Sequence, residues 1–315
     1  MATPPEVVSV GRVSVDLYAA EVGIGFDGQQ TFTKSVGGSP TNVAVAAARL
    51  GRRAALVTKV GDDGFGRYVR RRLEGWGVLT DYVRTQPGGQ TPLALAALDP
   101  PETPQVAFYR GPAAPDTMLI PDDLPDDVVR RCGLLWISQG ALALGSTADA
   151  CRVWLERRQR SGHTVLDLDY RPALWPDKDT ARAAAQDAIA LSTVVVGNRE
   201  ECEMAVGTGE PDAAADALLA AGVTLAIVKL GADGSLLATS EGRWRVAPVP
   251  VPVVCGLGAG DAFGGALSHG LLSGWDVPRI GRFANASGAY VSARLTCADA
   301  MPSVADVETM VGSSA

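Results

Sequence analysis

Short apolar runs alternate with longer segments along most of the chain, and this alternation is the main indication of the fold. Five runs have the length and apolar character of buried strands, and they cover residues 54–60, 134–138, 163–169, 193–197 and 224–230. Each is followed by a segment of helical length. Apolar strands that alternate with helices form a parallel sheet covered on both faces, so the pattern predicts a doubly wound α/β fold with a mostly parallel sheet.

Two segments break the alternation, at residues 12–36 and 91–110. Both contain strand-like runs without a helical segment between them, and the second is interrupted by the proline-rich stretch DPPETP. We expect these segments to form a small β lid, because a small appendage beside a large domain is a common way to cover a substrate. The α/β domain is then expected to comprise residues 1–11, 37–90 and 111–315.

The composition limits the classes of function that the chain can have. With 315 residues, 47% of them hydrophobic, the chain can bury the core of one large α/β domain. Its formal net charge of −7, without a long basic run, argues against a nucleic-acid partner. No stretch approaches the ~20 apolar residues of a membrane span, and the first residues do not resemble a signal peptide. We therefore expect a cytoplasmic protein that binds neither nucleic acid nor membrane.

The cysteines indicate no covalent framework. There are five of them, an odd number, at positions 132, 151, 202, 255 and 297. They lie far apart and never form a CxxC pair, so neither a disulfide framework nor a zinc site is indicated. We expect ordinary reduced thiols.

A glycine-rich segment near the end of the chain, CGLGAGDAFGGALSHG, carries the clearest candidate chemistry. A glycine-rich turn that opens a helix offers backbone N–H groups and the positive end of the helix dipole to an anion, most often a phosphate. Asp261 stands in this turn, where a carboxylate would repel a phosphate. It is expected either to cap the helix or to take a proton from a group attacking the phosphate. The dinucleotide-binding and P-loop patterns fail, because Asp261 stands three residues after Gly258 and no Gly-Lys-Ser/Thr follows.

An earlier pair of glycines also precedes a predicted helix, in SVGGSPTNVAVAAARLG. Gly37 and Gly38 form a turn, Ser39 is expected to cap the helix, and the next residue is a proline suited to the first helical position. The segment is either simply a well-started helix or a sugar site, where the ligand approaches the glycine backbone and Asn42 bonds its hydroxyls. Asp16 ends the alternating run VVSVGRVSVD and is expected to bind a hydroxyl pair from a strand end.

Four further polar residues allow two interpretations each. Asn198 follows a predicted strand and Glu201 stands three residues later. This is the spacing of a capping box, and the same pair can instead order waters around a magnesium ion. Arg110 ends the predicted lid and Arg171 follows another strand. Each is either an ion-pair residue at the surface or a forked donor to a substrate carboxylate, which a neutral sugar would not need.

Two segments resemble the signatures of the ribokinase-like (PfkB) carbohydrate kinases, in the family's order: GGSPTNVAVAAARLG and GAGDAFGGAL. The resemblance covers nearly the whole chain. Five shorter segments are similar to members that act on 5-dehydro-2-deoxy-D-gluconate in myo-inositol catabolism: GRVSVDLY, FYRGPAAPD, LDYRPALW, VVGNREECEMAVGT and LTCADAMPS. The resemblance implies a ribokinase-like fold and an ATP- and Mg²⁺-dependent kinase that phosphorylates the terminal hydroxyl of this sugar acid. Lid strands in this family often pair between subunits, so a homodimer through the lid is also implied.

The resemblance assigns roles to the glycine-rich segment. Asp261 matches the general base that takes the proton from the attacking hydroxyl. The N–H groups of Gly258, Ala259 and Gly260 match the anion hole that stabilises the transferred phosphoryl group. It follows that the acid faces the hydroxyl while the glycines hold the phosphate.

The resemblance also implies contacts for each ligand. The residues matching sugar-hydroxyl contacts are Asp16, Gly37, Gly38 and Asn42. The residues matching contacts to the carboxylate of a keto-deoxy sugar acid are Arg110 and Arg171. The nucleotide is expected to meet Lys229, Gly231, Gly258, Gly260 and Asn285, the last beside the adenine. Asn198 and Glu201 match the positions around Mg²⁺, which they are expected to reach through water.

One departure from the family pattern limits these expectations. Many members carry Asp-Thr-Thr or Asp-Thr-Ser before GAGD, whereas Cys255, Gly256 and Leu257 stand here. No phosphate contact from these side chains, and no potassium site built on that aspartate, is therefore predicted. The alternatives are a 2-dehydro-3-deoxygluconate kinase, a fructokinase or ribokinase, or a non-catalytic sensor of sugar acids. The intact GAGD weighs against the sensor, which needs no general base.

Overall fold

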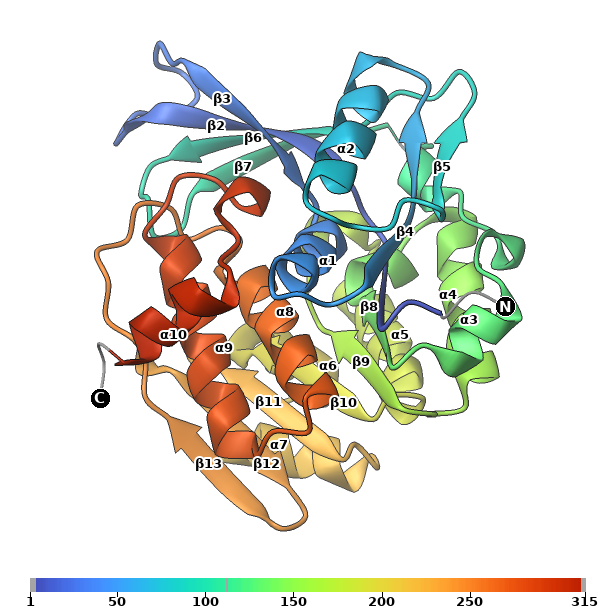
Figure 1. Ribbon diagram of the computed structural model, residues 1–315, viewed down its shortest axis with the longest axis vertical. Helices are drawn as coiled ribbons and strands as arrows, with labels where there is room; N and C mark the ends of the chain where they lie inside the picture. Colours follow the sequence, from blue (N-terminus) through green and yellow to red (C-terminus); the bar gives the residue numbers. More distant parts are fainter. Residues whose placement is uncertain (1–3, 112, 313–315) are drawn as a thin grey trace.

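The computed structural model describes residues 4–111 and 113–312. Its centre is a nine-stranded sheet with the order β13-β12-β11-β10-β9-β8-β1-β4-β5 (Figure 1). The parallel strands of this sheet are β1 (Val7–Val10), β4 (Ala54–Gly61), β5 (Val83–Gln86), β8 (Leu134–Ser138), β9 (His163–Asp167), β10 (Val194–Asn198) and β11 (Leu225–Lys229). An antiparallel hairpin of β12 (Ser235–Thr239) and β13 (Gly242–Val246) completes one edge.

The five apolar runs predicted as strands are all present, as β4, β8, β9, β10 and β11. The prediction of a doubly wound, mostly parallel sheet is therefore confirmed. One detail is wrong, because β11 is followed by the β12–β13 hairpin and not by a helix. The sequence after β11 contains only two short runs separated by a turn, and such runs pair as a hairpin more readily than they form a helix.

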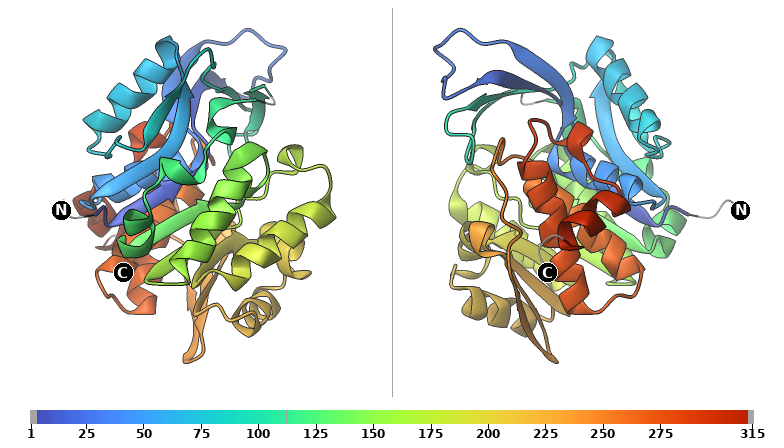
Figure 2. Two further views of the ribbon diagram at one scale, coloured as in Figure 1. Left: turned by 90° about the vertical axis from the view of Figure 1, so that its right-hand side faces the viewer. Right: turned by 60° about the vertical axis from the view of Figure 1, so that its left-hand side comes forward.

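Helices cover both faces of the main sheet. Successive side chains of a strand point to opposite faces, so an apolar strand presents apolar side chains to both faces, and both need to be covered. On β1 and β8, Val8 and Ile137 belong to one core, whereas Val7 and Trp136 belong to the other. The first core is closed by α3 (Asp126–Arg131), α4 (Gly145–Arg158), α5 (Lys178–Ala190), α6 (Arg199–Val206) and α7 (Pro211–Ala220). The second is closed by α1 (Ser39–Arg49), α8 (Ala259–Leu272), α9 (Val277–Ser292) and α10 (Val304–Gly312), as Figure 2 shows. The remaining helix, α2 (Gly64–Gly75), packs with α1 and β4 in a third core.

A second, four-stranded sheet stands beside the first, at the upper left of Figure 1. Its order is β3-β2-β6-β7, from β2 (Ser14–Val22), β3 (Phe32–Gly37), β6 (Leu93–Leu98) and β7 (Gln105–Tyr109). These strands fall in the two segments expected to form the lid, with β3 running one residue further. The division of the chain into a lid and an α/β domain at the stated boundaries stays a prediction.

The entry into the second sheet differs from the expectation for Asp16. The alternating run at the start of the chain forms two strands in two sheets, β1 and β2, separated by residues 11–13. Asp16 therefore lies inside β2 and not at a strand end. The break follows Gly11, whose φ of 137° is open mainly to glycine and lets the chain leave the main sheet.

All five cysteines are buried free thiols. Within residues 4–111 and 113–312, no helix is long and apolar enough to cross a membrane.

Candidate active site

The carboxyl ends of the central parallel strands gather charged side chains at one edge of the main sheet. Asp167 ends β9 and Lys229 ends β11, with Glu201 in the first turn of α6. The Nζ of Lys229 lies 3.9 Å from Asp167 Oδ1 and 3.8 Å from Glu201 Oε2. Burial alone would lower the pKa of Lys229, but the two carboxylates outweigh it and raise that pKa. Ligands of open α/β sheets bind outside this edge, so the cluster marks the candidate site.

Asp261 lies in the first turn of α8 and is partly exposed toward this edge. The N-cap of the helix is Gly258 and no side chain caps it, so the interpretation of Asp261 as a cap is wrong. The Nδ2 of Asn42, on α1, donates to Asp261 Oδ2 over 2.7 Å. Desolvation and the charge of Asp169 raise the pKa of Asp261 to about 6, against the hydrogen bonds from Asn42 and Ser39. A carboxylate poised in this way can accept a proton near neutral pH.

The start of α8 leaves no room for a side chain at Gly258 and little at Gly260. Gly258 has φ 81°, and a Cβ added there would lie 2.6 Å from the Sγ of Cys297. A Cβ at Gly260 would lie 3.3 Å from the Nζ of Lys229. The backbone at the positive end of the helix dipole therefore lies beside a buried ammonium group. Together these groups form a site suited to an anion such as a phosphate.

The two glycines before α1 sit where a side chain from β2, at Gly37, and the backbone of the β1–β2 connection, at Gly38, need space. A Cβ at Gly37 would lie 1.9 Å from Asp16 Oδ2, so the carboxylate of Asp16 rests directly on this glycine. Ser14 and Tyr18 donate hydrogen bonds to Asp16, over 2.6 and 3.1 Å. Burial raises the pKa of Asp16 despite these two bonds. Gly38, with φ 98°, forms the turn before α1 as expected, whereas Gly37 is the last residue of β3, so its prediction as a turn residue is wrong.

The expected cap of α1 is absent. Gly38 is the N-cap residue and no side chain caps this helix, so the prediction for Ser39 is wrong. Instead, Ser39 Oγ donates to Asp167 Oδ2 over 3.4 Å. The hydroxyl is drawn to the carboxylates at the sheet edge, since Asp167 and Asp261 both lie within its reach.

The two arginines each form an ion pair. Arg171 lies 2.9 Å from Asp169 Oδ1, and Arg110 donates to Asp116 Oδ1 over 2.6 Å. The side chain of Arg171 is 49% exposed, whereas that of Arg110 is 11% exposed, so the second pair is not a surface pair. Arg171 lies within electrostatic range of Asp261, because the charge of Asp261 contributes to its raised pKa.

Asn198 and Glu201 form the capping box of α6. Asn198 Oδ1 accepts from Glu201 N over 2.9 Å, and Glu201 Oε2 accepts from Asn198 N over 2.7 Å. The capping interpretation is therefore confirmed. No group of three or more acidic, histidine or cysteine side chains in the described residues could hold a metal by itself. A magnesium ion at Glu201 would need phosphate oxygens and water as its other ligands, which is its usual environment beside a nucleotide.

Comparison with known proteins decides the family. The sequence pattern of the "pfkB family carbohydrate kinase" group matches residues 4–304. The chain belongs to this family. It is 33% identical over 315 residues, covering 98% of this chain and 93% of the relative, to the 5-dehydro-2-deoxygluconokinase of Geobacillus thermodenitrificans (strain NG80-2). It is 30% identical over 316 residues, covering 98% and 93%, to the enzyme of the same name from Clostridium tetani (strain Massachusetts / E88).

A solved structure shows the same fold. A putative ribokinase II from E. coli, in complex with ATP and Mg²⁺, matches with a TM-score of 0.90 at 24% identity. The match covers 98% of this chain and 99% of the other. The predictions of a ribokinase-like fold and of a carbohydrate kinase are thus confirmed, and this pfkB-family protein is a carbohydrate kinase.

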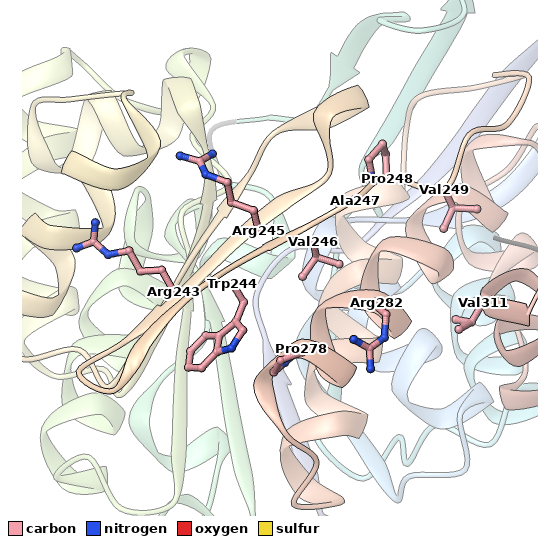
Figure 3. A pocket seen from close by; sticks show the side chains of 10 residues that line it. All are labelled: Arg243, Trp244, Arg245, Val246, Ala247, Pro248, Val249, Pro278, Arg282 and Val311. Atoms are coloured by element: carbon pink, nitrogen blue, oxygen red, sulfur yellow. The ribbon is translucent and has the colours of Figure 1, made fainter. Parts of the chain in front are cut away.

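Two other residues of this pfkB kinase were expected near the nucleotide, Gly231 and Asn285. Gly231, with φ 61°, begins the turn after β11. The Nδ2 of Asn285, on α9, donates to the carbonyls of Val246 and Ala247 over 3.2 and 2.9 Å, so it holds the end of β13. Val246 and Ala247 also line a hollow of about 550 Å³ between β13 and α9 (Figure 3). Trp244, Pro278 and Arg282 surround this hollow, while Arg243 and Arg245 point to the other side.

The sequence analysis missed three residues of the pfkB kinase site. Arg12 lies just after β1, and Asp167 and Asp169 lie at and after the end of β9. The acidic pair had a local signal, since both carboxylates stand in LDLD at the end of a predicted strand. Arg12 had none beyond its place after the first apolar run.

Proposed function

We propose that this kinase uses ATP and Mg²⁺ to phosphorylate the terminal hydroxyl of 5-dehydro-2-deoxy-D-gluconate. The observation that carries the proposal is the position of Asp261. Its carboxylate stands at the glycine-rich start of α8 and is hydrogen-bonded to Asn42, on the helix that follows Gly37 and Gly38. An acid between an anion site and residues suited to sugar hydroxyls is what transfer of phosphate to a hydroxyl requires. The names of the curated relatives support the choice of substrate.

Asp261 is the proposed general base. Asn42 and Ser39 donate to the carboxylate of Asp261, whose two oxygens have further lone pairs to accept the proton of the substrate hydroxyl. The hydroxyl oxygen then bonds to the γ-phosphorus, the bond to the β-phosphate breaks, and ADP leaves. The proton stays on the Asp261 carboxyl until solvent removes it. The pKa of about 6 suits this task, because the group is ionised at neutral pH yet basic enough to hold a proton.

Gly258, Ala259 and Gly260 are the proposed anion hole, and Lys229 adds a positive charge beside it. Bound ATP would supply the phosphoryl group that these N–H groups surround. The ammonium group of Lys229 lies between the carboxyl groups of Asp167 and Glu201, which hold it in place near Gly260. Fixed donors of this kind need no reorganisation when charge develops on the phosphoryl oxygens.

The remaining contacts follow the family resemblance. Asp16, Gly37, Gly38 and Asn42 are proposed to bind sugar hydroxyls; the Oδ1 of Asn42 supports this, since it is buried without a partner in the described structure. Arg110 and Arg171 are proposed to bind the carboxylate. Gly231 and Asn285 are proposed to lie beside the nucleotide. Asn198 and Glu201 are proposed to reach Mg²⁺ through water.

Two further expectations stay predictions. A homodimer through the lid is favoured by exposed apolar side chains on the second sheet, with Val22 59%, Phe32 41%, Phe108 46% and Tyr109 64% exposed. A cytoplasmic location is consistent with a sugar kinase.

Cys255 lies in a buried cluster with Tyr18, Leu98 and Cys297, so its side chain offers no oxygen ligand to a monovalent cation.

The substrate is tested by ADP release from ATP and Mg²⁺ with four acceptors. We expect the highest kcat/KM with 5-dehydro-2-deoxygluconate and lower values with 2-dehydro-3-deoxygluconate, fructose and ribose, because the arginines would lack a carboxylate in the last two. Preference for 2-dehydro-3-deoxygluconate would keep the sugar-acid class and change the substrate. Preference for fructose or ribose would contradict the carboxylate role of Arg110 and Arg171.

The pH dependence of turnover is expected to report Asp261. Desolvation raises its pKa to about 6, and the base acts only when ionised, so kcat/KM falls as the pH is lowered through about 6. Asn42→Ala removes a hydrogen bond that lowers this pKa, so the acidic limb of the profile moves to higher pH. Both profiles are measured with the same ATP and Mg²⁺, so that the titration of ATP cancels in the comparison. A limb that does not move would contradict the assignment.

A further inference from the structure

Arg12 is a buried arginine at the candidate site with no assigned role. It lies in the short connection between β1 and β2, and its side chain is 10% exposed. Its backbone is fixed against the start of α1: the carbonyl accepts from Thr41 Oγ1 over 2.9 Å, and a Cβ at Gly38 would lie 2.4 Å from the same oxygen. The side chain therefore starts from a rigid position at the carboxyl edge of the main sheet.

Arg12 and Arg171 share one carboxylate. The terminal nitrogen of Arg12 donates to Asp169 Oδ2 over 2.7 Å, and Arg171 lies 2.9 Å from Asp169 Oδ1. Burial alone would raise the pKa of Asp169, but Arg171 and Arg12 outweigh it and lower that pKa, so the carboxyl is ionised. Each oxygen of Asp169 thus faces one of two guanidinium groups.

Arg12 also lies near Arg110, the other arginine proposed to bind the carboxylate. Asp116 accepts from Arg110 through Oδ1 and from the backbone N–H of Val13 through Oδ2, over 2.6 and 3.1 Å. Arg110 is thereby tied to the residue next to Arg12. Burial and then the charge of Arg12 lower the pKa of Arg110, against the attraction of Asp116. Three guanidinium groups from the end of β7, the β1–β2 connection and the end of β9 thus belong to one cluster.

The three arginines share two aspartates as ion-pair partners, Asp116 and Asp169. Two carboxylates cannot use all the N–H donors of three guanidinium groups. The donors that remain suit an anion with two oxygens, such as a carboxylate.

The bonding of Arg12 differs from that of a purely structural arginine. Arg158, which is 1% exposed, donates to the carbonyls of Val129 and Cys132 over 2.7 and 2.8 Å. In the described part of the chain, the Nε of Arg12 is buried and has no hydrogen-bond partner. A buried donor left unpaired is costly and points to a ligand that would complete it.

We infer that Arg12 is a third arginine of the subsite that binds the substrate carboxylate, and that its pair with Asp169 sets the charge of this subsite. The inference rests on the proposed function, because it deepens the choice of a sugar acid. Arg12 supplies a third guanidinium group, and Asp169 orients Arg12 and Arg171 toward the same anion.

The test compares Arg12→Gln with the double variant Arg12→Gln/Asp169→Asn. The single variant removes one positive charge, so we expect KM for the sugar acid to rise about 10- to 100-fold, as for loss of a charged hydrogen bond, while KM for ATP changes little. The double variant also removes one negative charge, which returns the formal charge of the subsite to that of the wild type, and KM for the acid should partly recover. Equal rises in KM for the acid and for ATP, or no recovery in the double variant, would overturn the inference.

A binding measurement separates this inference from the choice of substrate. Binding of D-gluconate to the wild-type protein and to both variants is followed by the shift in melting temperature, with D-fructose as a neutral probe and Arg70→Gln, a partly buried arginine on α2, as a control for loss of an arginine. We expect the gluconate shift to be lost only in Arg12→Gln. If the wild-type enzyme phosphorylates only neutral sugars, the proposed substrate is wrong. If gluconate binds as well to Arg12→Gln as to the wild-type protein, the inference on Arg12 is wrong.

Discussion

Replacing Asp261 by asparagine lowers kcat by about 10²- to 10⁴-fold, the contribution typical of a general base. Asparagine has the same shape and can still accept the hydrogen bond from Asn42, so the geometry of α1 and α8 is kept. What is lost is the ability to hold the proton of the substrate hydroxyl. KM for ATP should change little, because the anion hole is built from backbone N–H groups.

The same substitution should not destabilise the protein. The pKa of Asp261 in the folded chain, about 6, lies above its ordinary value of 3.8. The folded state therefore binds the proton more tightly than the unfolded chain does, and near neutral pH the ionised group opposes folding. A neutral asparagine removes this cost, so the melting temperature at pH 7 should be equal or higher.

Single-turnover and steady-state kinetics with a saturating acceptor measure the effect of Asp261→Asn, and differential scanning calorimetry measures its stability. Asp187→Asn, on the exposed side of α5, is the matched control and should leave kcat unchanged. A loss of kcat below about tenfold would contradict the role of general base, since such catalysis contributes ~10²-fold or more.

The sequence predicted the parts of the fold that are encoded locally. The strands β4, β8, β9, β10 and β11 are continuous apolar runs, and a parallel sheet buried on both faces requires such runs. The lid was predicted to begin at residue 12, but the bounds of β1 and β2 and the place of Asp16 inside β2 could not be predicted in this way, because the two strands form one alternating run. Where the run breaks depends on the backbone at Gly11, and apolar patterning carries no information about it.

The same distinction holds for the site. Asp261 and the three small residues before it are adjacent in the chain, so their chemistry was visible in the sequence. Asn42 and Asp261 are 219 residues apart, and the packing of α1 against α8 brings them together. Arg12 and Asp169 are 157 residues apart and meet because β1 and β9 end at the same edge of the sheet. Ion pairs of this kind follow from strand order, which one sequence without relatives does not reveal.

Gly258→Ala should be the next most damaging single substitution, with a loss of about 10²- to 10³-fold in kcat, as when one donor of an oxyanion hole is removed. Gly258 has φ 81°, which an alanine adopts only with strain, and the added Cβ would lie 2.6 Å from the Sγ of Cys297. Either effect displaces the N–H groups at the start of α8 by a few tenths of an ångström or more. The anion hole depends on their positions, so catalysis is more sensitive than folding.

Two further variants separate the effect of backbone strain at Gly258 from the effect of the close contact with Cys297. Gly274, just beyond the other end of α8, has φ 66° and open space around it, so Gly274→Ala suffers the backbone strain alone and should lower the melting temperature without lowering kcat. Gly258→Ala/Cys297→Ala removes the close contact but keeps the strain, and it should recover part of kcat. If Gly258→Ala lowers the melting temperature but lowers kcat no more than Gly274→Ala does, the start of α8 is a structural turn and the proposed anion hole lies elsewhere. If activity falls and partly returns in the double variant, the contact between α8 and Cys297 controls the position of the donors.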